Sequence, residues 1–184
     1  DPEKKIAAEK WLYFGLESKS GYSNSVDKKW WEYDVSSFGH RAIMNDVTAA
    51  MAVEQLKKLP GFIARRKEIT ELYNSLLSDL TWLDIPPELP EYCTSSYYFY
   101  HIQVKDDLRD DLAKFLREND VYTTFRYFPL HRVKHYAIEG SSFPNADFAS
   151  DHTLCLPVHQ SLSDADVKLI AALIRRYGEE NKLK

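Results

Sequence analysis

The first part of the chain carries two helical patterns of apolar and charged positions. From Pro2 onward, apolar side chains recur among charged ones, and Gly15 is a candidate stop for this helix. A second pattern begins at Asn45 and continues to Leu77, with apolar residues three and four positions apart. Proline lacks an amide hydrogen and crowds the preceding turn, so Pro60 predicts a break or kink within this second helix.

The remainder of the chain predicts three short strands. Residues 97–104 alternate between two faces, residues 121–127 are rich in β-formers, and residues 154–156 are apolar and end at a proline. Residues 132–152 carry no clear period and contain glycine and proline, so we expect them to be irregular.

Two further helices are predicted between and after these strands. Asp106 or Asp107 is a candidate N-cap of the first, and Ser163 of the second, while Gly178 is a candidate stop. The order is therefore strand, helix, strand, irregular segment, strand, helix. This order favours an α/β fold, of the α+β kind, in which helices cover a short sheet.

Composition and charge narrow the function classes. Apolar residues make up 44% of 184 residues, the formal net charge is -4 and the pI is about 5.9. We therefore expect a globular protein without the basic surface that binds nucleic acid. No apolar run approaches the ~20 residues of a membrane span. Cys93 and Cys155 lie far apart, so we expect two free, buried thiols and a cytoplasmic location.

Few sequence signatures of chemistry are present. His131 and His135 stand four residues apart, but a third metal ligand is not evident, so no metal site is expected. The segment SFGHRAIMND, 37–46, places His40 and Arg41 just before a predicted helix start, where anions bind. The alternative interpretation is a surface arginine near a helix cap.

A second cluster lies in TTFRYFPLHRVKHY, residues 123–136. It places Arg126, Tyr127 and His131 at and just beyond the end of a predicted strand, where ligand sites are often built. The alternative is a rigid connection whose aromatic residues lie in the core.

The ordered set of segments resembles the DegT/DnrJ/EryC1/StrS family of pyridoxal-phosphate (PLP) sugar aminotransferases. The resemblance covers nearly the whole chain and rests on several segments: FGHRAIMNDVTAAMAVEQLKKL (38–59), RRKEITELYNSLL (65–77), LRDDLAKFLRENDVYTTFRYFPLH (108–131) and LCLPVHQSLSDADV (154–167).

The resemblance implies the C-terminal part of a fold-type I PLP transferase. Residues 1–43 would be the end of the large PLP domain with a dimer-crossing loop, 44–78 a long joining helix, and 79–184 the small α/β domain. The Schiff-base lysine of the family would lie upstream, so this chain would hold no catalytic residue and would be inactive alone. Trp11, Phe14 and the helix from Met44 would then expose apolar surface.

The resemblance also implies roles for single residues. Arg41 occupies the position that contacts the PLP phosphate of the other subunit. His40, which stands beside it in place of an aromatic residue, is the second cofactor-binding candidate. Arg126, Tyr127 and His131 fall in the segment that faces the sugar nucleotide. Asn119-Asp120 replaces a common glycine, and an Asn or Asp can adopt the left-handed turn that glycine provides.

Three functions stay open from the sequence. The first is a homodimeric cytoplasmic aminotransferase of polysaccharide or antibiotic sugar biosynthesis, which moves an amino group from glutamate or glutamine to a keto-sugar nucleotide. The second is a PLP-dependent or PMP-dependent (pyridoxamine-phosphate) sugar dehydratase of the same family. The third is a non-catalytic stand-alone subunit, either a binding module or the partner of a separate large-domain chain.

Overall fold

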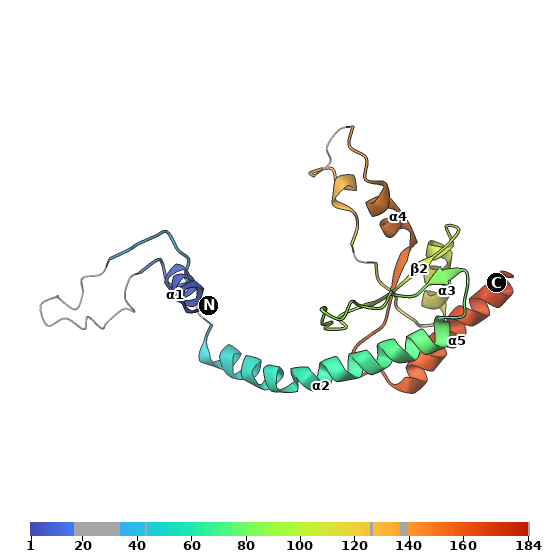
Figure 1. Ribbon diagram of the computed structural model, residues 1–184, viewed down its shortest axis with the longest axis horizontal. Helices are drawn as coiled ribbons and strands as arrows, with labels where there is room; N and C mark the ends of the chain where they lie inside the picture. The colour runs from blue at the N-terminus through green and yellow to red at the C-terminus, as the bar shows by residue number, and fades with distance from the viewer. Residues whose placement is uncertain (17–33, 43, 126, 137–139, 184) are drawn as a thin grey trace, which may run out of the picture. The chain divides into compact units, whose positions relative to one another are not determined.

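The chain forms two compact units, Asp1–Lys57 and Lys58–Lys184, in a computed structural model that describes residues 1–16, 34–42, 44–125, 127–136 and 140–183 (Figure 1). The fold is mixed α/β, as the sequence predicts. The elements in chain order are α1 (Pro2–Trp11), α2 (Asp46–Leu77), β1 (Leu83–Asp84), β2 (Tyr100–Val104), α3 (Arg109–Glu118), η1 (Leu130–Arg132), α4 (Pro144–His152), β3 (Thr153–Leu156) and α5 (Asp164–Glu180).

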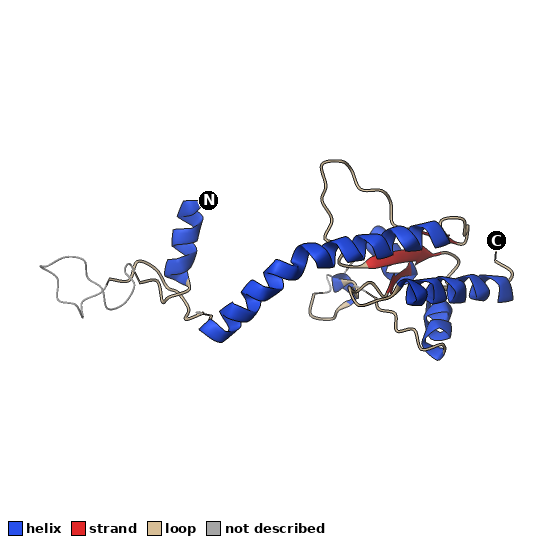
Figure 2. Cartoon of the chain, turned by 90° about the horizontal axis from the view of Figure 1, so that it is seen from below, coloured by secondary structure: helices blue, strands red, loops and turns tan. Residues whose placement is uncertain are grey.

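The sheet lies in the second unit, where Figure 2 draws its strands in red. Its strands are antiparallel in the order β1-β2-β3. Leu83 pairs with Val104, and Tyr100 pairs with Leu156. Along β2, Tyr100, Ile102 and Val104 are buried, whereas the residues between them are only partly buried. This alternation is the one that the sequence predicts, and it directs one face of the central strand into the core.

The core of the second unit joins α2 to this sheet. The rings of Tyr73 and Tyr100 stack with centroids 4.8 Å apart, and both side chains are fully buried. The Tyr73 hydroxyl donates to the Pro157 carbonyl at 3.1 Å, and the Tyr100 hydroxyl donates to Asn74 Oδ1 at 2.9 Å. Each buried hydroxyl is therefore satisfied, which removes the cost of burying it.

The break predicted at Pro60 is wrong, because α2 runs continuously over Asp46–Leu77 with Pro60 inside it. A proline removes one backbone hydrogen bond and crowds the preceding turn. Several turns on each side supply compensating bonds, and the C-terminal part of the helix is held in the core by Ile69, Tyr73 and Leu77.

Two of the predicted strands are shorter in the structure. β2 begins only at Tyr100, because Tyr97 has a φ of 48°, which extended strands do not adopt. Among the described residues of 121–127, Thr124 alone pairs, through a single bridge to Cys155. The segment 132–152, expected to be irregular, ends in the helix α4.

The structure also corrects one helix start and confirms the other. Asp106 and Asp107 do not cap α3; both have φ near +56° in a turn, and Leu108 is the N-cap without a side-chain hydrogen bond. Ser163 caps α5 as predicted. Its hydroxyl accepts from the Asp166 amide at 3.1 Å, and Asp166 accepts from the Ser163 amide at 3.1 Å, which forms a capping box.

Gly178 does not end α5, which continues to Glu180. A Cβ at Gly178 would lie 2.8 Å from Nε1 of the buried Trp82. The glycine therefore does not end the helix; it allows the helix to approach the Trp82 ring closely.

Neither cysteine forms a disulfide within the described part of the chain, as predicted. Cys155 is buried, but Cys93 is exposed and so departs from the expected burial. Across the described residues, none of the helices is both long and apolar enough to span a membrane.

We predict that Gly178→Ala lowers the free energy of unfolding by about 1–3 kcal/mol, because the methyl group overpacks the contact with Trp82. Gly61→Ala is the matched control, since a Cβ there meets no atom within 4 Å. We expect it to raise the free energy of unfolding by about 0.5–1 kcal/mol. Urea unfolding followed by circular dichroism measures both, and equal effects of the two variants would contradict the packing role.

Candidate functional site

In the first candidate segment, 37–46, the described residues before position 43 are held by backbone hydrogen bonds to the end of α1 in the first unit. The His40 amide donates to the Trp11 carbonyl at 2.8 Å, and the Ala42 amide donates to the Leu12 carbonyl at 3.0 Å. Tyr13 and Arg41 form an isolated antiparallel bridge. These bonds determine where the backbone of Arg41 lies.

Two glycines make this close pairing possible. A Cβ at Gly39 would lie 2.4 Å from the Trp11 carbonyl oxygen, and a Cβ at Gly15 would lie 1.7 Å from that of Ser37. Gly15 also has a φ of +73°, which favours glycine. Side chains at either position would force the two backbones apart.

His40 and Arg41 differ in what their side chains do. The His40 ring meets Trp11 edge-on, with centroids 5.0 Å apart, so it packs against the end of α1. The Arg41 side chain is exposed, and within the described part of the chain its guanidinium has no ion pair or hydrogen bond. Asn45 then caps α2, where its Oδ1 accepts from the Thr48 amide at 2.9 Å. An arginine just before a capped helix suits an anion.

The second candidate segment lies in the second unit. Tyr127 and Phe128 are 74% and 57% exposed, and η1 follows them directly. Arg126 lies outside the described residues. Tyr127 and His131 therefore lie in this segment of the second unit, and His40 and Arg41 lie in the first unit.

His131 is turned toward α4. Its Nε2 lies 2.8 Å from Asp147 Oδ1, and its ring lies against Phe143 with centroids 4.9 Å apart. Arg132 Nε donates to the same Asp147 oxygen at 2.7 Å, and its two terminal nitrogens donate to the carboxylate of Asp151 at 2.7 and 2.8 Å.

These contacts lower the pKa of both carboxyl groups below its ordinary value. For Asp147 the largest cause is the hydrogen bond from His131, and for Asp151 it is the hydrogen bond from Arg132. Both aspartates are therefore ionised near neutral pH, and each acts only as a hydrogen-bond acceptor.

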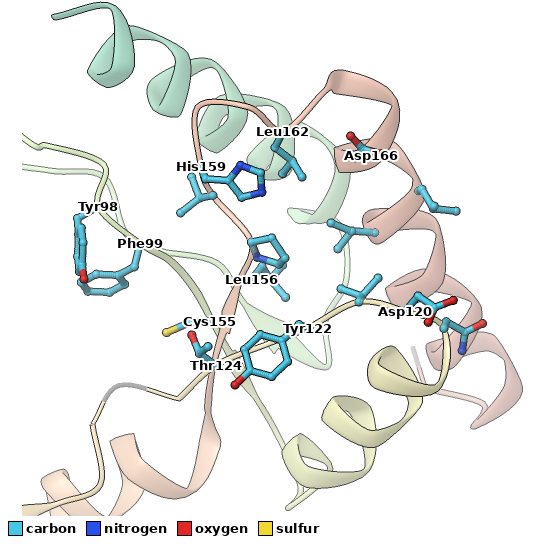
Figure 3. A pocket seen from close by; sticks show the side chains of 16 residues that line it. Tyr98, Phe99, Asp120, Tyr122, Thr124, Cys155, Leu156, His159, Leu162 and Asp166 are labelled. Carbon is cyan, nitrogen blue, oxygen red and sulfur yellow. The ribbon is translucent and has the colours of Figure 1, made fainter. Parts of the chain in front are cut away.

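The sequence did not reveal a hollow of about 570 Å³ in the second unit (Figure 3). Its walls come from β3 and the residues after it, from α5 and from residues 119–124. Tyr98, Phe99 and Tyr122 line it and are 56%, 50% and 66% exposed. Asp120, also in the wall, has a φ of 61°, so it adopts the left-handed turn expected from the sequence. Alternating aromatics in 97–104 were the available signal, but their exposure depends on the turn at Tyr97.

Comparison with known proteins identifies relatives over almost the whole chain. Residues 3–175 match the DegT/DnrJ/EryC1/StrS aminotransferase family. A dTDP-4-dehydro-2,3,6-trideoxy-D-glucose 4-aminotransferase from Saccharopolyspora spinosa is 43% identical over 172 residues, which are 93% of this chain and 44% of that protein. A dTDP-4-amino-4,6-dideoxy-D-glucose transaminase from Escherichia coli is 28% identical over 78% of this chain and 40% of its own length.

Solved structures agree. The aminotransferase TlmJ from Streptoalloteichus hindustanus has a TM-score of 0.81 at 44% identity, over 96% of this chain and 45% of that one. The putative sugar aminotransferase Spr1654 from Streptococcus pneumoniae, in its PMP form, shares the fold with a TM-score of 0.83 at 22% identity, over 98% of this chain and 46% of that one. The chain thus spans under half the length of these relatives.

The lowered pKa values of Asp147 and Asp151 predict a pH dependence of stability. Because each pKa is lower in the folded protein than in the unfolded chain, the carboxylates stabilise the fold above the unfolded value of about 4. This stabilisation is lost as the pH falls from about 5 through the folded pKa. The double variant Asp147→Asn/Asp151→Asn should therefore be less stable than the wild type near pH 7, and the difference should shrink below about pH 4. Unfolding in urea from pH 7 to pH 3 measures it, and a difference that stays constant would contradict the assignment.

Proposed function

Because the chain belongs to the DegT/DnrJ/EryC1/StrS aminotransferase family, we propose that it is the C-terminal portion of a PLP-dependent aminotransferase. The enzyme transfers an amino group from glutamate or glutamine to the keto group of a nucleotide sugar. The observation that carries this proposal is the 43% identity over 172 residues to a 4-aminotransferase of a dTDP sugar. Free Cys93 and Cys155 fit a reducing cytoplasm.

The donor set around Arg41 fits the phosphate group of PLP. Its guanidinium is exposed, its backbone is fixed by the bridge to Tyr13, and α2, which Asn45 caps, begins five positions further along the chain at Asp46. A forked guanidinium donates two parallel hydrogen bonds to a phosphate, which an ammonium group cannot do. In the homodimer that we propose, Arg41 holds the cofactor phosphate of the partner subunit, and His40 fixes the segment by packing on Trp11.

Bound PLP supplies an electron sink for moving the amino group. The residues of this chain bind and orient. Lys4, Lys5 and Lys10 do not match the position of the Schiff-base lysine of the family, so that lysine lies outside these residues and the chain alone is inactive. In this proposal the complete PLP site combines residues of this chain with the Schiff-base lysine outside it.

Tyr127 is the residue we propose to contact the nucleotide sugar. At 74% it is more exposed than the neighbouring Phe128, at 57%. An exposed aromatic ring offers a face to a nucleobase or to the apolar side of a sugar. Arg126, next to it in sequence, is proposed to bind the diphosphate, because a guanidinium matches phosphate geometry. His131 also belongs to this substrate-side segment.

The proposed function is tested with the complete enzyme, PLP, L-glutamate and dTDP-linked or GDP-linked 4-keto sugars. We expect 2-oxoglutarate to be released beyond one equivalent per bound PLP only when a keto-sugar nucleotide is present. Conversion of the sugar by loss of water, without release of 2-oxoglutarate, would contradict the proposal and would indicate the dehydratase branch of the family.

We predict that Arg41→Ala weakens PLP binding by about 10- to 100-fold, the expected cost of losing a hydrogen bond to a charged group. Arg41→Lys should fall between the wild type and Arg41→Ala, because it keeps the charge and loses the fork. Lys58→Ala removes an exposed cation elsewhere on α2 and is the control. Equilibrium dialysis gives the affinities, and thermal melting without PLP checks the fold. Equal affinity of Arg41→Ala and wild type would refute the phosphate contact.

We predict that Tyr127→Ala raises the KM for the nucleotide sugar by about 2- to 10-fold, as expected for one aromatic contact. The KM for glutamate should rise less, because glutamate carries no nucleobase or sugar ring for Tyr127 to contact. Tyr92→Ala is the control, since Tyr92 is 89% exposed and lies in the proline-rich segment. Steady-state kinetics with each substrate varied in turn provide the measurement, and a parallel rise of both constants would count against this role.

A further inference from the structure

A cluster of charged side chains connects η1 to α4. Asp147 accepts from two successive residues, His131 and Arg132, through the same oxygen at 2.8 and 2.7 Å. Asp151, one turn further along α4, accepts both terminal nitrogens of Arg132. One face of α4 therefore binds both side chains that end η1.

Backbone hydrogen bonds connect η1 to Pro129, the residue after the exposed Tyr127 and Phe128. The Arg132 amide donates to the Pro129 carbonyl, and the Val133 amide donates to the Leu130 carbonyl, both at 3.0 Å. Pro129 directly follows Phe128, and its ring restricts the backbone at that point. Fixing His131 and Arg132 therefore limits the directions that Tyr127 and Phe128 can take.

The helix α4, which binds η1, is itself held by Arg109 on α3. Arg109, on α3, donates to the Ser150 carbonyl at 3.1 Å and to the Thr153 carbonyl at 3.2 Å. Its guanidinium also lies 5.1 Å from the centroid of the Phe125 ring. Arg109 thus contacts both the end of α4 and Phe125, which precedes Tyr127 in the chain.

We propose that Asp147 is a positioning residue of the nucleotide-sugar site: by binding His131 and Arg132 it holds η1 against α4 and sets the direction in which Tyr127 meets the substrate. The inference rests on the proposed function. It gives His131 a role through Asp147, in which its Nε2 carries the hydrogen that the carboxylate accepts. The segment then presents its aromatic rings without having to be ordered when substrate arrives, which lowers the cost of binding.

The charged contacts are suited to positioning more than to stability. The side chains of Asp147, Asp151 and Arg132 are 35%, 44% and 34% exposed, and ion pairs at such exposure contribute little individually. The two parallel hydrogen bonds to Asp151 fix the plane of the Arg132 guanidinium, so they give the contact a defined orientation. Loss of Asp147 should therefore loosen the segment and leave the domain folded.

The test compares wild type with Asp147→Asn, Asp147→Glu and Asp79→Asn in the complete enzyme with PLP. Asp79→Asn is the matched control, because Asp79 also forms a hydrogen-bonded ion pair with an arginine, Arg175, in the same unit. We expect Asp147→Asn to weaken binding of dTDP-glucose and to raise the KM for the keto-sugar nucleotide, each roughly 10-fold. The KM for glutamate should stay unchanged.

Hydrogen exchange gives a second readout that does not depend on turnover. Amides of residues 129–136 should exchange faster in Asp147→Asn than in wild type, Asp147→Glu should recover most of the protection and of the affinity, and Asp79→Asn should change neither. Unchanged dTDP-glucose affinity in Asp147→Asn, or the same losses in Asp79→Asn, would overturn the inference. A wild type that binds dTDP-glucose but aminates no sugar would refute the proposed function alone, and the affinity of Asp147→Asn would still decide the role of Asp147.

Discussion

The stacked pair of Tyr73 and Tyr100 is the contact on which the second unit depends. It joins α2 to the central strand of the sheet, and its two hydroxyls bind Asn74 and the Pro157 carbonyl at the end of β3. Burial raises the pKa of both phenols above the ordinary value, so both stay neutral and can donate over the physiological range. One aromatic contact thus fixes a helix, a strand and the segment that borders the hollow.

Around that contact, each unit presents its candidate segment by a different physical device. In the first unit, close backbone pairing that needs Gly15 and Gly39 leaves the Arg41 side chain exposed. In the second, charged side chains on α4 hold the residues that follow Tyr127. Both arrangements order the segment before any ligand binds. This lowers the entropy cost of binding and fixes the direction of the binding side chains.

The sequence predicted best what depends on local pattern. The burial of Tyr100 follows from strand alternation, and the cap at Ser163 from helix-end chemistry. The expected apolar exposure is also confirmed: Trp11, Phe14 and Met51 are 49%, 48% and 66% exposed. Predictions failed where distant residues decide. Gly178 meets Trp82 instead of ending α5, and Pro60 stays inside a helix whose C-terminal part is packed in the core. The pairing of Asp147 with His131 was not predicted at all, because the two residues stand 16 positions apart and no local pattern links them. The family resemblance supplied Arg41 and Tyr127, but no periodicity could show which side chains are exposed and which are held.

Isotope tracing shows whether the amino nitrogen passes from glutamate to the sugar. The complete enzyme is incubated with PLP, ¹⁵N-labelled glutamate and a dTDP-linked 4-keto sugar, and the nucleotide sugar is analysed by mass spectrometry. An aminotransferase produces an amino sugar that carries one ¹⁵N atom. A sugar that is recovered unchanged, or that has lost water without gaining the label, would contradict the proposed function.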